Sequence, residues 1–442
     1  MKERGLFELY DSDPERADAL VFGRRTGLDR RGFLKGASLA AMGAAVGGTI
    51  PFAANMPGGL IPAALAQSAP AGADAPKILS MDGKAALTVL QDRPLNAETP
   101  AHLLDDDITP TEKFFIRNNG NPPDAPADPK AWKIRIDGEV NQPIEITLGE
   151  LESRFKPATY QLQLECGGNG RSGFTPEARG NQWGNGAVGN AEWTGVPLRD
   201  VLQAAGLKPS AVYTAHYGAD VHLSGDPNRP TISRGVRLEK AMDQHTLIAW
   251  RMNGQPITNV HGGPLRLVVP GWPGSASHKW LTRIWIRDRE HDGPGMTGTN
   301  YRVARTPMVP GGKTPDANMA VLEDMPVRSI ITSPAHGTEM PDGLRRIELR
   351  GAAWAGEQSV REVEVSADFG ITWTKAQVRR GVNRYAWQRW TAAVNLPSEG
   401  YYEIWSRATD SNGTTQPFAA GNWNPQGYGG NPYHRVAVLV KA

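Results

Sequence analysis

Residues 161–171 contain an alternating segment that runs directly into a glycine-rich turn. Polar side chains and leucine alternate over residues 161–165, and a period of two is typical of a β-strand. Cys166 follows at once, and three of the next four residues are glycine. Because glycine permits backbone conformations and close approaches that other residues do not, the sequence predicts a strand that ends at Cys166 in a tight turn.

Cys166 is the only cysteine among 442 residues. Its place at a strand end, five residues before Arg171, suits a soft metal ligand or a nucleophile, because a nearby cation favours the thiolate. A free cysteine is also among the residues most often buried for packing alone. The segment by itself leaves both interpretations open.

The rest of the chain indicates short strands and frequent turns. The sequence contains 50 glycines and 35 prolines, which punctuate alternating segments such as residues 132–140. Helical patterns are short, at residues 148–155 and 198–205. Strands and short helices in irregular alternation predict an α+β domain, a mixed α/β arrangement rather than a doubly wound sheet.

From Pro326 onward the pattern changes to evenly spaced short strands, which favours an all-β immunoglobulin-like sandwich. The Gly/Pro-rich segment 307–315 is the predicted linker. We therefore expect three parts: residues 1–66 as an export signal, 67–320 as the catalytic domain and 321–442 as the sandwich.

Charge and cysteine content exclude several classes of function. The formal net charge of +2 gives no basic field for nucleic acid. A single cysteine excludes an intramolecular disulfide, a Cys-x-x-Cys-His haem attachment, a cysteine-ligated iron–sulfur cluster and a multi-cysteine zinc site. Redox chemistry in this chain would need another kind of centre.

The N-terminus has the features of a twin-arginine export signal. Arg30 and Arg31 precede a weakly apolar, uncharged run at residues 36–50, and Ala64 and Ala66 form an A-x-A cleavage pattern. A membrane anchor is the alternative, but a spanning helix needs about 20 apolar residues, and prolines, glycines and an asparagine interrupt residues 51–59. Cleavage near Ala66 predicts a periplasmic protein without a membrane span.

Cationic residues gather at three further places. Arg117 ends a short apolar strand, where its charge needs an anion or a structural ion pair. Two Gly/Pro turns present His261 with Arg266, and His278 with Lys279. Basic side chains around glycine turns suit a phosphate group, although either loop alone could be solvated.

Several of these segments, taken in order, resemble the sulfite oxidase family. The likeness spans about residues 110–440 and is carried by the segments at 114–118, 164–171, 261–266, 268–271, 278–281 and 433–436. The resemblance implies a molybdenum–molybdopterin cofactor and a C-terminal module that forms a homodimer. We expect no haem in this chain, because a single cysteine excludes covalent haem and residues 67–110 are too short for a haem domain and lack the His-Pro-Gly-Gly sequence that the family's haem domain carries. Five or six motifs in register are a specific signal.

The resemblance also implies the roles of individual residues. Cys166 is the expected metal ligand, and the expected substrate residues are Arg117, Arg171, Tyr301 and Arg389. The expected contacts of the cofactor, besides Arg117 and Cys166, are Phe114, Phe115, Ile116, Asn118, Asp220, His261, Arg266, Ser277, His278 and Lys279.

Two positions depart from the family pattern. Animal members have histidine where this chain has Asn119, so the pterin or proton contact that the resemblance implies for that histidine does not carry over to this chain. The family's C-terminal substrate arginine lies in a Trp-Arg-x-Trp stretch, whereas here Trp387 is followed by Gln388, Arg389 and Trp390. In a strand, a shift by one residue reverses the facing of a side chain unless a bulge restores it.

The resemblance implies oxidation of sulfite to sulfate, with electrons passed to an external c-type cytochrome. Three alternatives remain: a family member acting on sulfane, a family member reducing a sulfoxide or nitrate, and an exported binding protein without enzyme activity. The C-terminal sandwich argues against a sulfoxide reductase, because the sulfoxide reductases associated with this fold lack that domain. A binding protein without enzyme activity would have no reason to keep the cysteine and the cationic loops in the family's order.

Overall fold

The computed structural model describes Asp13, Arg16 and residues 76–441, except residues 227, 314 and 342. The predicted twin-arginine segment and cleavage pattern at residues 29–66 lie outside the described residues. In the described part of the chain, no helix has the length and apolarity needed to cross a membrane. The first strands of the described chain form a hairpin of β1 (Thr88–Asp92) and β2 (Leu95–Glu98).

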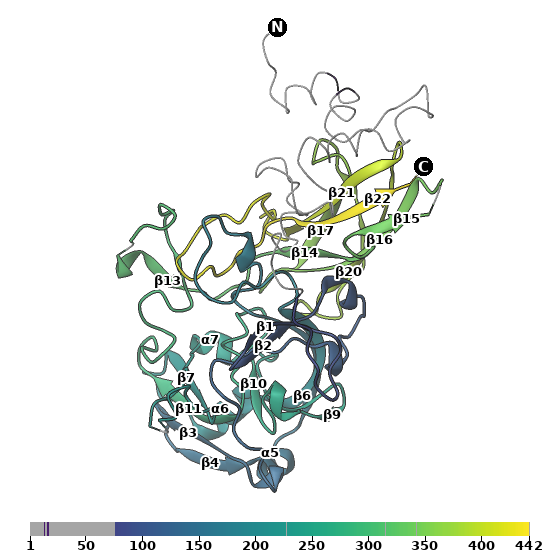
Figure 1. The fold of residues 1–442 in the computed structure, drawn as a ribbon. Helices are drawn as coiled ribbons and strands as arrows, with labels where there is room; N and C mark the ends of the chain where they lie inside the picture. The colour runs from purple at the N-terminus through teal and green to yellow at the C-terminus, as the bar shows by residue number, and fades with distance from the viewer. Residues whose placement is uncertain are drawn as a thin grey trace.

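Two sheets build the domain in the lower half of Figure 1. One has the strand order β10-β8-β6-β5, with β9 on β8, and the other has the order β4-β3-β11-β7, in which only β3 and β11 are parallel. The strands of the first sheet are β5 (Ala158–Glu165), β6 (Val188–Pro197), β8 (Leu247–Met252), β9 (Gln255–Pro256) and β10 (Arg266–Val268). Those of the second are β3 (Lys133–Gly138), β4 (Ile144–Thr147), β7 (Tyr213–Gly218) and β11 (Leu281–Arg287).

Apolar side chains from both sheets form one core with helix α6 (Leu198–Ala205). The helix buries Leu198, Val201, Leu202 and Ala205, a spacing that places all four on one face. It ends at Gly206, whose φ of 69° lies in the left-handed region that glycine adopts readily. The two other α-helices of the described residues are short: α5 (Leu148–Arg154), which begins with a capping box at Thr147, and α7 (Leu238–Ala241).

Two further sheets form the sandwich in the upper half of Figure 1. Their strand orders are β14-β16-β20-β19 and β15-β22-β21-β17-β18. The strands of the first are β14 (Arg328–Ser333), β16 (Arg346–Trp354), β19 (Gln377–Val378) and β20 (Gln388–Asn395). Those of the second are β15 (Thr338–Met340), β17 (Val360–Ser366), β18 (Thr374–Lys375), β21 (Gly400–Asp410) and β22 (His434–Val440). Ile347, Leu349 and their counterparts on the other sheet fill the core between them.

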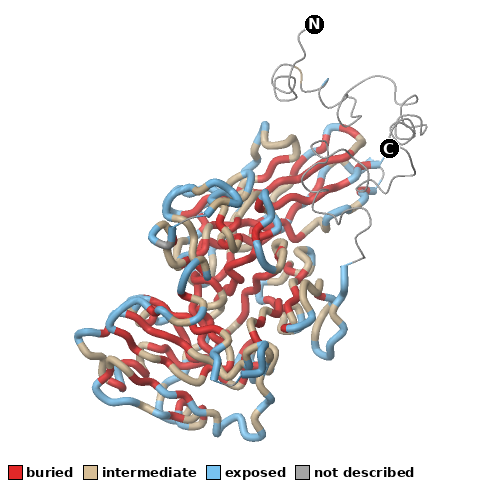
Figure 2. The backbone as a smooth tube through the Cα atoms, turned by 60° about the vertical axis from the view of Figure 1, so that its left-hand side comes forward, coloured by how far each residue is buried: buried red, intermediate tan, exposed pale blue. Residues whose placement is uncertain are grey.

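The predicted α+β class with a C-terminal sandwich is confirmed: the part of the chain that the structure describes is mostly sheet with few helices. Figure 2 shows buried backbone running through both domains and across their junction. The remaining strands are β12 (Arg302–Ala304) and β13 (Met319–Val321), and the 3-10 helices are Ala101–Leu103, Thr111–Lys113, Pro129–Ala131, Arg171–Gly173, Asn259–His261 and Asp316–Asn318.

Candidate active site

The cysteine loop begins where β5 ends, as the sequence predicts. Cys166 follows Glu165 directly, is 6% exposed, and its sulfur lies 3.4 Å from the amide nitrogen of Gly168. Gly170 has a φ of 80°, and a Cβ atom there would lie 2.3 Å from the carbonyl oxygen of Gly430. The loop therefore needs glycine at this position, because the sandwich domain approaches its backbone too closely for a side chain.

A buried ion pair ties this loop to the sandwich. The carboxylate of Glu165 lies 3.0 Å from Nε of Arg328 and accepts a hydrogen bond of 2.7 Å from the indole of Trp354. Arg328 also donates to the carbonyl of Asn169 within the loop, at 2.9 Å, and to that of Gly430. Breaking a buried pair leaves an uncompensated charge, so these contacts fix the loop relative to the second domain.

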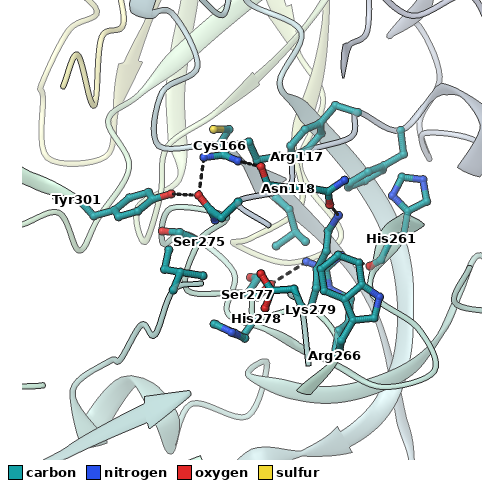
Figure 3. Close-up of a pocket in the computed structure, with 18 residues that line it drawn as sticks. Arg117, Asn118, Cys166, His261, Arg266, Ser275, Ser277, His278, Lys279 and Tyr301 are labelled. Atoms are coloured by element: carbon teal, nitrogen blue, oxygen red, sulfur yellow. Dashed lines mark hydrogen bonds between the residues drawn. The ribbon is translucent and has the colours of Figure 1, made fainter. Parts of the chain in front are cut away.

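Cys166 faces a pocket assembled from segments far apart in the sequence (Figure 3). Figure 3 shows Tyr301 and Ser275 on one side of the pocket and His261 and Arg266 on the other. The lining residues are Phe114, Phe115, Arg117, Asn118, Asn119, Leu164, Cys166, Asp220, Ile232, His261, Arg266, Gly274, Ser275, Ser277, His278, Lys279, Trp280 and Tyr301.

Arg117 joins the cysteine to the tyrosine side of the pocket. Its Nη2 donates to Oδ1 of Asn119 at 2.6 Å, and the hydroxyl of Tyr301 donates to the same oxygen at 3.3 Å. Burial disfavours the charged form of Arg117, but the neighbouring Tyr301 and Cys166 outweigh it and raise its pKa. Asn119, the position that departs from the family pattern, thus bridges the two expected substrate residues.

Tyr301 is held in an uncommon backbone conformation. Its φ of 48° is in the left-handed region, which a bulky residue rarely adopts unless the surroundings impose it. Its ring stacks on that of Tyr428, with centroids 4.9 Å apart and planes at 16°. Tyr428 comes from the segment between β21 and β22, so the sandwich domain positions the catalytic tyrosine candidate.

The opposite end of the pocket carries positive charge. The guanidinium of Arg266 donates to the carbonyls of His261 and Ser277 at 2.7 and 2.9 Å. Lys279 donates to Oδ1 of Asn118 and to the carbonyl of Val260, both at 2.7 Å. These contacts are to neutral oxygens, so they orient the cations and leave their charges uncompensated.

Burial and mutual repulsion lower the pKa values of the basic side chains at this end of the pocket. Burial lowers the pKa of Arg266 to about 9. Burial, followed by the nearby Arg266 and Arg117, lowers the pKa of Lys279 well below its usual range. Burial, then Arg266 and Arg234, lowers the pKa of His278 to about 3, so this imidazole is neutral. A bound anion would restore the charged forms.

The residues present fit a phosphate-bearing, metal-binding cofactor. Asp220 is the one carboxylate in the lining, and burial raises its pKa, so the pocket offers little negative charge of its own. The hydroxyl of Ser275 is buried in the lining and has no hydrogen-bond partner among the described residues. Buried polar atoms are normally satisfied, which indicates a polar ligand here. Cys166 offers a soft sulfur ligand at the other end.

Three of the predicted site residues do not line the pocket. Ile116 is fully buried in a small cluster under the β1–β2 hairpin. Arg171 donates to the carbonyls of Gln426 and Asn181 and lies over the ring of Tyr428, 5.3 Å from its centre.

The structure places Arg389 away from the pocket. Arg389 is on β20, paired with Asp105 and donating to the carbonyl of Leu104 at 3.0 Å. No bulge reverses the shifted motif: Arg389 lies opposite Ala352 in the regular β16–β20 register. The one-residue shift therefore directs its side chain to the interface with residues 104–105.

The sequence interpretation missed several lining residues, among them Leu164, Ile232, Gly274, Ser275 and Trp280. Ser275 follows Pro273 and Gly274 and lies two residues before Ser277, an expected cofactor contact. Its place in the 271–279 loop could therefore have indicated that it lines the pocket. Tyr428, which supports Tyr301 from outside the lining, gave no signal, because its proximity depends on the packing of two domains.

Comparison with known proteins identifies the class. Residues 120–294 match the family model described as the oxidoreductase molybdopterin binding domain, and residues 319–441 match the Mo-co oxidoreductase dimerisation domain. The first match includes most of the residues that line the pocket, and the second includes the strands of the sandwich. The chain is thus a molybdopterin oxidoreductase that binds the molybdenum cofactor.

The chain belongs to the sulfite oxidase family. It is 33% identical to sulfite oxidase of Gallus gallus over 361 residues, covering 79% of this chain and 77% of that protein. It is 32% identical to the mitochondrial sulfite oxidase of Drosophila melanogaster over 366 residues, covering 79% of this chain but only 62% of that protein. An NADH nitrate reductase of Spinacia oleracea is 30% identical over 397 residues, covering 83% of this chain and 41% of the relative.

A solved structure shares the arrangement. The sulfane dehydrogenase SoxCD from Paracoccus pantotrophus matches with a TM-score of 0.66 and 27% identity, covering 83% of this chain and 90% of that chain. The likeness therefore extends over both domains described above.

Proposed function

We propose that this chain is an exported, molybdenum-dependent sulfite dehydrogenase. The overall reaction converts sulfite and water to sulfate, two protons and two electrons, and an external c-type cytochrome receives the electrons singly. The observation that carries the proposal is the juxtaposition in one pocket of Cys166, Arg117 and Tyr301 with a buried cationic cradle at the other end.

The residues divide into two tasks. Arg266, Lys279 and the Ser275 hydroxyl would hold the anionic part of the cofactor, and Cys166 would ligate the metal. When bound, the cofactor supplies oxygen-atom transfer to sulfur and accepts two electrons. The chain's own contribution is to fix these groups in position within one pocket.

Arg117 and Tyr301 would bind the substrate anion. The guanidinium of Arg117 offers paired donors that match an oxyanion. The Tyr301 hydroxyl, which donates to Asn119 at 3.3 Å, can turn to donate to a substrate oxygen instead. Asn119 then holds Arg117 through its hydrogen bond of 2.6 Å and keeps the guanidinium oriented for the anion.

Sulfane oxidation is the second candidate, supported by the likeness to SoxCD over 90% of that chain. Reduction of nitrate is a third, since the spinach relative carries that name. Both would use the same cofactor end of the pocket, so the substrates have to be compared directly.

Location and assembly complete the proposal. The twin-arginine pattern at residues 30–31 and the A-x-A pattern at 64–66 support export to the periplasm. The match of residues 319–441 to a dimerisation domain supports a homodimer.

The test compares substrates with one preparation of the mature, cofactor-loaded protein. Under anaerobic conditions, sulfite, thiosulfate and nitrate are each supplied with an oxidised or reduced dye as required, and sulfate is measured by ion chromatography. We expect dye reduction with sulfite and one sulfate per two electrons. Turnover of thiosulfate but not of sulfite would favour sulfane oxidation as the function. Oxidation of the reduced dye on addition of nitrate would show that the chain is a nitrate reductase.

A further inference from the structure

A buried guanidinium that pairs with no carboxylate of the described residues lies next to the tyrosine side of the pocket. Arg234 is fully buried, and its Nη1 donates to the carbonyl of Gly295 at 3.1 Å and lies 2.7 Å from the sulfur of Met296. Its Nε and Nη2 have no hydrogen-bond partner among the described residues. Burial lowers the pKa of Arg234, although the nearby tyrosines, Tyr301 first among them, act in the opposite direction.

Arg234 is coupled to the candidate substrate site through aromatic rings. Its guanidinium carbon lies 4.7 Å from the ring centre of Tyr301, and Tyr301 stacks on Tyr428, over which Arg171 lies at 5.3 Å. We call Arg171, Arg234, Tyr301 and Tyr428 the guanidinium–tyrosine cluster. Arg234 also contributes to lowering the pKa of His278 in the pocket lining.

Packing alone does not explain this arginine. An isolated buried charge is strongly unfavourable, and contact with the face of one tyrosine ring offsets only part of that cost. A neutral side chain of similar volume would fill the same space without that penalty. Because no carboxylate among the described residues pairs with Arg234, the missing counter-charge indicates an anion that is present only when ligand is bound.

We propose that Arg234 supplies a third positive charge at the substrate end of the pocket, with Arg117 and Arg171, and thereby favours doubly charged oxyanions over singly charged ones. Arg234 acts across the ring of Tyr301, so it is a positioning residue for the anion rather than a direct contact. It would take the part that the sequence assigned to Arg389, and the proposal rests on the oxyanion chemistry proposed above.

The test uses two anions of similar size and different charge. Sulfate and methanesulfonate are titrated at pH 8 into the cofactor-loaded protein, with calorimetry for affinity and sulfite turnover for inhibition. Arg234→Gln and Arg234→Met remove the charge, Arg234→Lys keeps it, and Arg237→Gln is the matched control. Arg237 is three residues away and pairs at the surface with Glu323.

We expect Arg234→Gln and Arg234→Met to weaken sulfate binding roughly tenfold or more and methanesulfonate binding by a much smaller factor, since the lost attraction scales with ligand charge. Arg234→Lys should recover most of the preference, and Arg237→Gln should leave it unchanged. The ligand-free melting temperature of Arg234→Met should be unchanged or higher, because an unpaired buried charge has been removed.

Equal weakening of both anions, or a fall in the melting temperature of Arg234→Met with no change in charge preference, would overturn the proposal and make Arg234 a structural residue. Failure of the neutral variants to fold would overturn it as well, because it would show that the charge is needed without ligand. If the wild type binds sulfate in an Arg234-dependent way but does not oxidise sulfite, the anion site stands and the proposed function fails.

Discussion

At the scale of single residues, the site combines one soft ligand with buried cations that have no carboxylate of their own. The sulfur of Cys166 lies at one end, Arg266 and Lys279 lie at the other, and Asp220 is the only acid in the lining. Because the proposed metal ligand and the proposed contacts of the anionic cofactor lie at separate ends, substitution at one end should spare the other.

Cys166→Ser tests the metal ligand. We expect turnover to fall to background, because a serine hydroxyl does not replace a thiolate towards a soft metal, while much of the pterin remains bound by the intact cationic end. Metal analysis and pterin fluorescence after release measure the two components separately. Wild-type activity in this variant would remove Cys166 from the ligand assignment.

Arg117→Gln tests the anion pocket. The variant should raise KM for sulfite and lower kcat, reducing kcat/KM by roughly 10- to 100-fold, the range expected for losing a charge-assisted hydrogen bond. Arg389→Gln is the comparison, since the structure places that side chain on Asp105. If Arg389→Gln lowered kcat/KM as much as Arg117→Gln, the position of Arg389 in the structure would not describe the working enzyme.

Most of the lining residues were named through the resemblance to the sulfite oxidase family, and the glycine turns with their flanking cations are local signals that independently indicated Cys166 and the two cationic loops. Prediction from the sequence failed where a contact depends on how distant segments meet. Arg389 was assigned by a motif shifted by one residue, and the regular register of β20 turns it to Asp105. Arg234 and Tyr428 were not considered, because their contacts with Tyr301 join segments that are far apart in the sequence, and no local pattern predicts such contacts.

At the scale of elements, the loops around the site are held by strand ends. Glu98, the last residue of β2, accepts hydrogen bonds from the amides of Gly184 and Gly186 at 2.9 and 3.3 Å. Gly184 in turn accepts from the amide of Gly170 in the cysteine loop, at 2.6 Å. The β1–β2 hairpin therefore supports the cysteine loop indirectly.

This support should depend on pH. Burial raises the pKa of Glu98 to about 7, although hydrogen bonds from Gly186 and Gly184 act against it. Between pH 4.5 and 7 the folded protein keeps a proton that the unfolded chain has lost, so the free energy of unfolding decreases as pH rises through this window. The decrease from this group is at most about 3 kcal/mol.

Glu98→Gln should remove that pH dependence, because the amide keeps an acceptor oxygen and carries no charge. Urea unfolding of the wild type and the variant at pH 5 and pH 8 measures the difference, with Glu177→Gln as an exposed control. A variant that lost as much stability as the wild type between these pH values would show that Glu98 is not the group responsible.

Elements were easier to predict than their arrangement. The alternating residues 161–165 and 132–140 and the helical patterns at 148–155 and 198–205 correspond to β5, β3, α5 and α6, since each pattern matches the period of its own backbone. The sequence analysis did not predict the β1–β2 hairpin, because its strands are short and half-buried and so give no clear alternation.

At the scale of the whole molecule, the two domains share one site. Arg328 and Trp354 of the sandwich hold Glu165 beside Cys166, and Tyr428 of the sandwich stacks on Tyr301. A sandwich that served only to join two copies of the chain would not need these contacts. The second domain therefore shapes the substrate end of the pocket in addition to its expected part in dimer formation.

The most direct test follows electrons from sulfite to an acceptor in stopped flow. The cofactor-loaded protein is mixed with saturating sulfite and purified cytochrome c, or with oxygen alone, and sulfate is quantified. We predict rapid cytochrome reduction that slows as ionic strength rises, as expected for an electrostatically steered encounter, with two cytochromes reduced per sulfate and little oxygen consumed. Rapid oxygen uptake without cytochrome reduction would make this chain an oxidase, and the absence of sulfate with either acceptor would contradict the assignment of sulfite as its substrate.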